Sequence, residues 1–285
     1  MPITPQRPIH IFSEEEFKEM DRRILRVVFD VQNHFGRFLE EELFKREIAA
    51  RIAERRIGIV DQEFRIRVTH ESFEKVYRID LLVGSGLLIE AKAVETLSPA
   101  HRAQTFNYLF LSGMSHGLLV NLRTEQVQHE YVSTSLTADA RHQFSIVDAD
   151  WQPMNSTGDW LKKKMLELLQ DWGAFLEVLL YRDAITHFLG GKTNVVRPVN
   201  VMSGDRILGQ QEIHLLSPNT AFALSAVTGD HVPMQRHLSR FLRHTPLEFF
   251  QWINLNHHQI EFRTLSRIDL RNENQNEWQN DVNVD

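Results

Sequence analysis

The sequence predicts an α/β protein of two tandem domains, each with a central mixed β-sheet flanked by helices. Residues 14–134 show helical patterns, then three strand patterns including a hairpin, then a helix and further strands. Residues 148–271 repeat that order with many matching residues. The length of 285 residues and the 42% hydrophobic content suit two globular domains. We therefore expect domains at 1–147 and 148–271, the second opening on a polar linker, and a polar, disordered tail at 272–285.

Composition excludes several classes of site. The absence of cysteine excludes disulfides, thiolate metal sites and a cysteine nucleophile, and it fits a reducing compartment. No apolar run is long enough to span a membrane, and residues 1–5 lack the apolar core of a signal peptide. A cytoplasmic protein without a membrane partner is the expectation. The net charge of -6 argues against a broadly basic surface but leaves a local basic cleft open.

Two helices open the first domain. Ser13 and Glu16 form a capping-box pattern, which predicts a helix from Glu14 to His34. Its apolar face would consist of Phe17, Ile24, Val27, Val28 and Val31. Gly36 interrupts the pattern, and a second helical stretch runs from Phe38 to about Arg56.

Three strands and a helix follow. Residues 63–68 alternate apolar and charged side chains, as a strand buried on one face does. Residues 77–83 and 87–93 are apolar and β-favouring, and Gly84-Ser85-Gly86 between them predicts a hairpin loop. Ser98-Pro99 predicts the start of a helix. Further along, residues 117–122 read as a buried strand and residues 130–133 as an edge strand.

The hairpin carries the sharpest chemical pattern. If Val83 pairs with Leu87, antiparallel register brings Asp80 opposite Glu90. Alternation along the strand puts Glu90 and Lys92 on one side, and Asp80 should join them. Two opposed carboxylates repel each other, and a divalent cation between them would cancel that cost. The alternatives are solvent-facing charges on an open sheet, and a Lys92 that serves only as the ion-pair partner of Glu90.

These residues resemble the PD-(D/E)XK nuclease superfamily, and in particular its GxxExxY branch, over about residues 14–134. Asp80 followed by Glu90-Ala91-Lys92 matches the (D/E)XK element, and Gln104 with Tyr108 matches a QxxxY element. The stretch Phe38-Leu39-Glu40 is similar to the element of the first helix that contributes the Glu of the branch.

That element also departs from the branch. Arg37 stands where the branch has its Gly, with Gly36 one place early, and Leu43 stands where the branch has Tyr.

The resemblance implies a restriction-endonuclease-like fold and a nuclease that uses Mg²⁺ or Mn²⁺. Asp80, Glu90, the main-chain carbonyl of Ala91 and Glu40 would be the metal ligands. Lys92 would position or deprotonate the attacking water or stabilise negative charge, and Gln104 would orient a ligand or a phosphate. Glu40 lies in a run of three glutamates, so its choice rests on the resemblance alone.

The second half reads as a degenerate repeat of the first. Residues 173–185 share Gly, Phe, Leu, Glu, Leu and Ile with residues 36–48, inside a stretch that we expect to be helical from Trp160 to Phe188. From Val94 to Leu122 the offset to the second copy is constant, because 227 minus 94 and 255 minus 122 both give 133.

The chemistry of the first copy is lost in the second. His214, Ala223, Ser225 and His237 stand at the places of Asp80, Glu90, Lys92 and Gln104, and Glu177 alone echoes Glu40. A rival interpretation is a new metal site formed by His214 and His237, for which the sequence shows no evident third ligand. The stretch from Gln235 to His244 puts three arginines and two histidines near one helix, either as a phosphate contact or as a solvated face.

The sequence therefore predicts a metal-dependent nuclease with one active centre in the first repeat, and DNA is the expected substrate. RNA or branched DNA stays open. The second repeat would serve architecture, a pseudo-dimer, or the binding of substrate or partner, and a homo-oligomer stays open. The alternative class is a non-catalytic nucleic-acid-binding or protein-binding module that inherited the fold.

Overall fold

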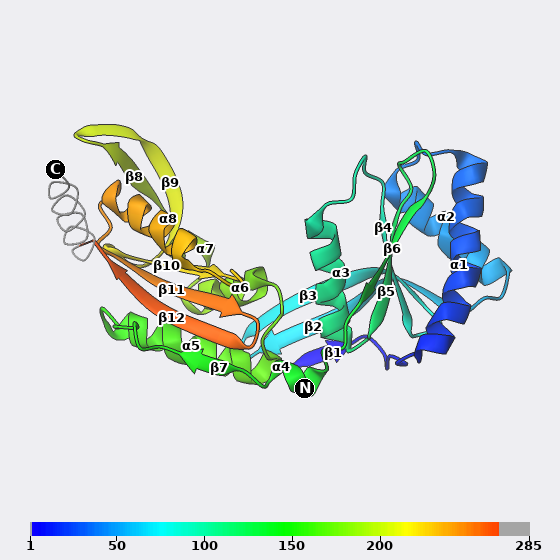
Figure 1. Ribbon diagram of the computed structural model, residues 1–285, viewed down its shortest axis with the longest axis horizontal. Coiled ribbons are helices and arrows are strands. Elements are labelled where there is room, and N and C mark those ends of the chain that lie inside the picture. The colour runs from blue at the N-terminus through cyan, green and yellow to red at the C-terminus, as the bar shows by residue number, and fades with distance from the viewer. Residues whose placement is uncertain (1, 268–285) are drawn as a thin grey trace, which may run out of the picture. The chain divides into compact units, whose positions relative to one another are not determined.

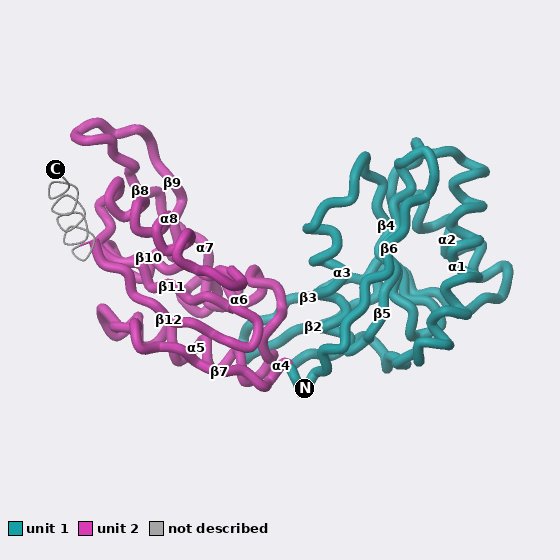
Figure 2. Tube along the Cα trace, in the orientation of Figure 1, with its two compact units in different colours: residues 1–140 teal, residues 141–285 magenta. Residues whose placement is uncertain are grey.

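The protein consists of two compact α/β units, residues 1–140 and the chain from Arg141 onward (Figure 2). The computed structural model describes residues 2–267. Each unit has a mixed sheet of six strands flanked by helices, which confirms the predicted fold class. The expected tail at 272–285 lies outside the described residues.

The first unit builds its sheet in strict chain order (Figure 1). All neighbouring strands run antiparallel except β4 and β5, which are parallel because helix α3 crosses between them. Its helices and strands are β1 (Ile3–Pro5), α1 (Glu14–Phe35), α2 (Glu41–Glu54), β2 (Val60–His70), β3 (Phe73–Val83), β4 (Leu87–Lys92), α3 (Pro99–Ser112), β5 (His116–Asn121) and β6 (Gln128–Ser133).

Helices α1 and α2 cover one face of this sheet and α3 lies on the other (Figure 1). The main core joins the apolar faces of α1 and α2 to alternate residues of the central strands, among them Leu81, Ile89 and Val120. Burying each such side chain stabilises the unit by about 1.5–3 kcal/mol. Because Ile89 and Ala91 point into this core, Glu90 and Lys92 point to the opposite face.

The hairpin has the predicted register. Val83 pairs with Leu87 and Leu81 with Ile89 across the three-residue loop. Gly84 and Ser85 adopt positive φ values of 59° and 66°. Gly86 is required by a close approach of the chain, since a Cβ there would lie 2.4 Å from the carbonyl oxygen of His10.

The second unit uses the sheet order β7-β12-β11-β10-β9-β8. Its helices and strands, with the short α4 at the boundary, are α4 (Ala138–Arg141), β7 (Ser145–Val147), α5 (Ser156–Trp172), α6 (Val178–Phe188), α7 (Lys192–Val195), β8 (Val196–Ser203), β9 (Arg206–Ser217), β10 (Thr220–Ser225), α8 (Val232–Arg243), β11 (Phe249–Asn256) and β12 (Gln259–Ser266).

Strands β8 to β12 repeat the order and the directions of β2 to β6. The parallel pair is β10 with β11, and α8 crosses between them as α3 does in the first unit. Lys92 pairs with Asn121 in the first unit, and Ser225 pairs with Asn254 in the second, so the predicted offset of 133 holds residue by residue.

A buried asparagine closes the same loop in both units. The Asn121 side chain accepts a hydrogen bond from the Val94 backbone N–H and donates one to the Val94 carbonyl. Asn254 makes the same two bonds with Val227, at 2.8 and 2.9 Å. Both asparagines are fully buried. The same pair of hydrogen bonds at matching positions supports common ancestry of the two units.

The structure differs from the sequence predictions in three places. The predicted helix from Trp160 to Phe188 is two helices, because Gly173 takes a φ of 76° and ends α5. The unit boundary precedes position 147, since β7 pairs in parallel with β12. The sequence did not predict β1, which lengthens the first sheet by pairing with β2.

None of the helices within residues 2–267 combines the length and apolarity that a transmembrane helix needs.

We expect Asn121→Ala and Asn254→Ala each to lower the free energy of unfolding by about 1–3 kcal/mol, because each leaves a buried N–H and carbonyl without partners. Chemical denaturation measures the change. Asn33→Ala, on the exposed surface of α1, is the control and should change the free energy by less than about 0.5 kcal/mol. An equal effect of all three substitutions would contradict a structural role for the pair.

Candidate active site in the first unit

Asp80, Glu90 and Lys92 meet inside the first unit. The Lys92 Nζ lies 2.6 Å from Glu90 Oε1 and 3.9 Å from Asp80 Oδ2. The exposed fractions are 8% for Asp80, 1% for Glu90 and 9% for Lys92. These residues are therefore not solvent-facing charges on an open sheet. The ion pair between Lys92 and Glu90 is present, as one sequence interpretation proposed.

Strand β3 loses its ladder partners at Asp80. Its pairing with β2 is present at Leu81 and Ile79 but not at Asp80, and its pairing with β4 ends at Leu81. Glu63 of β2, which would face Asp80, has a positive φ of 53°. The Asp80 side chain takes over one backbone bond, since Oδ2 accepts from the Ala91 N–H at 2.9 Å. The strands thus separate where the carboxylates lie.

Lys45 of α2 is a partner of Asp80 that sequence reasoning missed. Its Nζ lies 3.1 Å from Asp80 Oδ1 and also contacts Glu63 and Glu42, at 2.9 and 3.1 Å. Burial lowers the pKa of Lys45, but the hydrogen bond to Glu63 and the charge of Asp80 outweigh burial and raise it. The sequence offers one indication that Lys45 matters: the matching position of the second repeat is also basic, at Arg182.

The pKa of Glu90 is strongly raised. Burial and the charge of Asp80 raise its pKa to about 8, although Lys92 acts in the opposite direction. Its Oε2 is buried and has no hydrogen-bond partner within the described residues. Burial lowers the pKa of Lys92, but the charge of Glu90 outweighs burial and raises it. A buried carboxylate oxygen without a partner is where an absent ligand would bind.

The glutamate on the helix side is placed differently from the expectation. Glu40 is the N-cap residue of α2 and its side chain is exposed. Glu41, the next residue, is half-buried, and its Oε2 accepts a hydrogen bond from the Ala93 N–H at 3.3 Å. The charge of Glu41 also contributes to raising the pKa of Glu90. Glu41 lies one helical turn before Lys45, so both face the sheet, while the role of Glu40 stays a prediction.

Gln104 and Tyr108 of α3 are hydrogen-bonded to each other. The Gln104 Nε2 donates to the Tyr108 hydroxyl at 3.1 Å. Tyr108 is 7% exposed and its ring packs edge-on against Tyr77, so it is a core residue. Within the described residues the side chain of Gln104 forms no hydrogen bond with Asp80, Glu90 or Lys92, so its role toward a ligand or phosphate stays a prediction.

The donor chemistry of the cluster suits a hard divalent cation. Such ions take oxygen ligands, and Asp80, Glu90 and Glu41 supply carboxylates from β3, β4 and α2. Their ligand atoms do not all lie within 4.8 Å of one another in the described structure, so a shared ion would have to draw the three side chains together. The unpartnered Glu90 oxygen and its raised pKa indicate a positive charge that the side chains alone do not supply. The carbonyl of Ala91 stays a predicted ligand.

The corresponding place in the second unit is organised differently. The Ser225 hydroxyl donates to Asn254 Oδ1 and accepts from Trp252 Nε1, both at 2.8 Å. Ala223 has no polar side chain, and His214 packs edge-on against Phe222. No carboxylate stands at the three positions that match Asp80, Glu90 and Lys92, all of which lie within residues 2–267.

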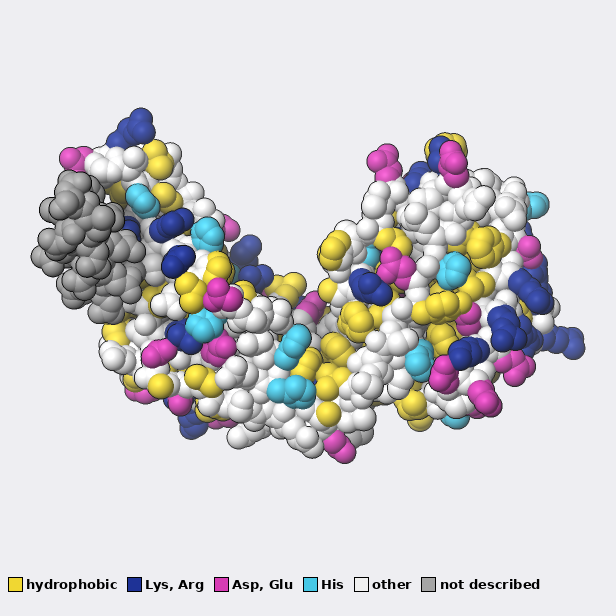
Figure 3. Space-filling model, viewed as in Figure 1, with side chains coloured by type: hydrophobic (Ala, Val, Ile, Leu, Met, Phe, Trp, Pro, Cys, Tyr) yellow, Lys and Arg dark blue, Asp and Glu magenta, His cyan; other side chains and the backbone are white. Residues whose placement is uncertain are grey.

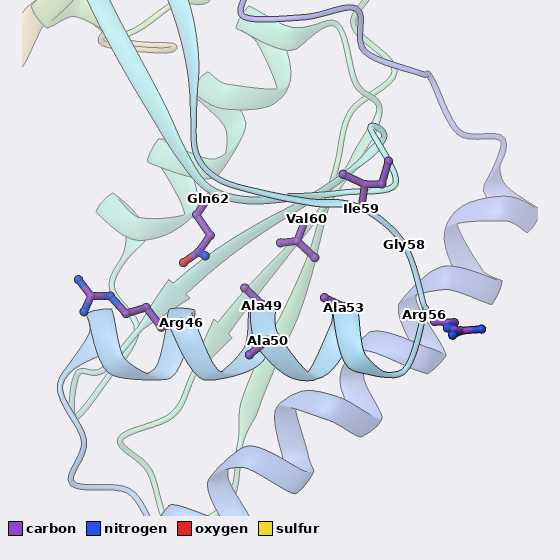
Figure 4. Close-up of a pocket in the computed structure, with 9 residues that line it drawn as sticks. All are labelled: Arg46, Ala49, Ala50, Ala53, Arg56, Gly58, Ile59, Val60 and Gln62. Atoms are coloured by element: carbon purple, nitrogen blue, oxygen red, sulfur yellow. The ribbon is translucent and has the colours of Figure 1, made fainter.

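A separate groove of about 650 Å³ lies between α2 and the start of β2 (Figure 4). Small and apolar side chains form it between two arginines, and its lining consists of Arg46, Ala49, Ala50, Ala53, Arg56, Gly58, Ile59, Val60 and Gln62. The carboxylates of the cluster are not part of this lining. The chemistry of the first unit therefore lies elsewhere.

Comparison with known proteins agrees with the geometry. Residues 18–133 match a family model described as the PD-(D/E)XK nuclease superfamily. The match lies within the first unit and includes Asp80, Glu90, Lys92 and Gln104, and it confirms the resemblance. No curated protein and no solved structure matches the chain. The assignment to the GxxExxY branch stays a prediction.

We expect the affinity for Mn²⁺ to rise about tenfold per pH unit below pH 8 and then level off, because a cation must displace the proton that Glu90 holds below its raised pKa. Isothermal titration calorimetry in buffers of different ionisation enthalpy measures the released proton. Glu90→Gln should remove both binding and proton release, and Glu125→Gln, an exposed control, should keep them. Binding without proton release at pH 6 would contradict the assignment.

Proposed function

We propose that the first unit, with its PD-(D/E)XK nuclease match at residues 18–133, is a metal-dependent nuclease that hydrolyses phosphodiester bonds, with DNA as its expected substrate. The observation that carries the proposal is the buried cluster of Asp80, Glu90 and Lys92 at the point where the strands separate. An apolar sheet gains no stability from two adjacent carboxylates, since their mutual repulsion and desolvation oppose folding. Function explains their presence better than structure does.

The residues of the cluster would have separate roles in the reaction. A bound Mg²⁺ or Mn²⁺ would polarise a phosphoryl oxygen and lower the pKa of a bound water. Asp80 is fixed for ligation by Lys45 on one oxygen and by the Ala91 N–H on the other. Lys92 keeps its proton because its pKa is raised, so in the cation-free protein it is equipped to stabilise negative charge at phosphate rather than to accept a proton.

The second unit would have a non-catalytic role in this nuclease. Its sheet repeats the strand order of the first, but Ala223 and Ser225 replace the metal-binding and cationic residues. Architecture, or the binding of substrate or a partner, is its proposed task, and a fused pseudo-dimer is one form of it. We place the reaction in the cytoplasm, in keeping with the cysteine-free sequence.

We expect Glu90→Gln and Lys92→Ala each to lower the rate of cleavage by about 10²–10⁴-fold, because one removes a metal ligand and the other a charge at the phosphate. The assay uses single-stranded, double-stranded and branched DNA, and RNA, each with Mg²⁺ or Mn²⁺. Lys18→Ala on the exposed surface of α1 is the control and should leave the rate unchanged.

The outcomes separate the two classes of function. Cleavage that persists in both variants would remove the assigned site. Absence of cleavage of every substrate by the wild-type protein, together with retained binding, would instead support a non-catalytic binding module.

A second pair of variants separates the two candidate glutamates. Glu41→Gln should lower the cleavage rate by at least about tenfold, because Glu41 bonds the Ala93 N–H directly after the strand that carries Glu90, and its charge acts on Glu90. Glu40→Gln on the exposed N-cap is the matched change. A loss with Glu40→Gln alone would assign the role to Glu40, as the family resemblance implies.

A further inference from the structure

Helix α8 of the second unit has one apolar face and one basic face. Met234, Leu238, Phe241 and Leu242 pack against the core of the unit. The other face carries three exposed arginines and two exposed histidines, which we call the basic stripe: Arg236, His237, Arg240, Arg243 and His244. Figure 3 shows Lys or Arg and His side chains together over α8.

The spacing of the basic stripe is regular. Arg236, Arg240 and Arg243 follow at intervals of four and three residues, which places them on one face of the helix. They span about 10.5 Å along the axis at about 1.5 Å per residue. One strand of duplex DNA presents a phosphate about every 3.4 Å of axis, so three arginines cover about three phosphates.

The basic stripe has no acidic counterpart on its own helix. Residues 232–243 contain no Asp or Glu, whereas α2 pairs Arg46 with Glu42 and Arg51 with Glu47 one turn apart. Within residues 2–267 no ion pair is formed by Arg236, Arg240 or Arg243. A helix surface that is merely solvated would gain from such pairs, and this one has none.

The first unit supplies an internal control for these charges. By the offset of 133, the three arginines of α8 correspond to Ala103, Asn107 and Phe110 of α3. Both helices cross between the parallel central strands of their sheets. The fold therefore does not need arginine at these positions, and the second unit acquired or kept the charges for another reason.

We propose that the basic stripe of α8 binds the phosphate backbone of the nucleic acid on which the first unit acts. This inference rests on the proposed function, because it takes a nucleic acid as the substrate. The contacts would be independent of base sequence, since they involve phosphates alone. The second unit is then a substrate-binding module that replaced metal chemistry with positive charge.

The test is fluorescence anisotropy with a short labelled DNA duplex in EDTA, where cleavage is suppressed. The triple variant Arg236→Ala, Arg240→Ala, Arg243→Ala should bind about tenfold more weakly or worse. The slope of log K against log salt should fall by up to about 0.9 for each phosphate that the variant no longer neutralises. Alanine favours helix, so thermal melting should show α8 and the unit intact.

The matched control is Arg22→Ala, Arg23→Ala, Arg26→Ala, which removes three exposed arginines from α1, where acidic residues flank them at Glu19, Asp21 and Asp30. This control should retain the wild-type affinity and salt slope. Equal losses in both triple variants would indicate a general effect of net charge and would overturn the assignment to α8.

Two further outcomes also decide the matter. Residues 269–285 carry an acidic residue at every fourth position, and if this tail were the partner of the basic stripe, the α8 variant would bind DNA as tightly as wild type. That result would overturn the proposal, as would wild-type protein that does not bind DNA. Wild-type protein that binds through α8 but never cleaves would support the stripe and remove the nuclease function.

Discussion

The loss of strand pairing at Asp80 is the constraint on which the geometry of the carboxylate cluster depends. A regular antiparallel ladder would seal β3 against both neighbours and leave no room for a ligand between carboxylates. At Asp80 neither neighbouring strand supplies a ladder partner, and the Asp80 side chain bonds the freed Ala91 N–H. Lys45 then balances part of the charge from the side of α2. The unusual backbone of Glu63 belongs to this same opening.

Residual charge imbalance distinguishes this cluster from a structural ion-pair network. Lys92 and Lys45 each contact carboxylates, yet Glu90 keeps a buried oxygen without a partner among the described residues and a raised pKa. A network selected for stability alone would satisfy that oxygen or replace it with an apolar group, which is often neutral or favourable. The second unit shows that replacement, with Ala223 at the matching place.

Much of this arrangement was readable from the sequence. The hairpin register followed from the loop length, and strand alternation placed Glu90 with Lys92 on one face. The predicted repeat offset of 133 also relates the pairing of Ser225 with Asn254 to that of Lys92 with Asn121. Lys45 and Glu41 were missed because their roles depend on how α2 packs on the sheet, and the charge run of that helix gives no local indication of which residues turn inward. The break at Gly173 was missed because the flanking apolar pattern continues across it.

The repeated topology of the two units has a consequence for how this chain folds. Two copies of one topology with matching registers can exchange strands before either is complete, which is a characteristic misfolding route of repeat proteins. The two sheets differ in register and in the position of one edge strand. The pairing of β9 with β10 contains a register shift that β3 with β4 lacks, and the outer edge strand joins at opposite ends of the two sheets. These differences make an exchanged strand a poorer match for the sheet of the other half, and so disfavour misfolding between the copies.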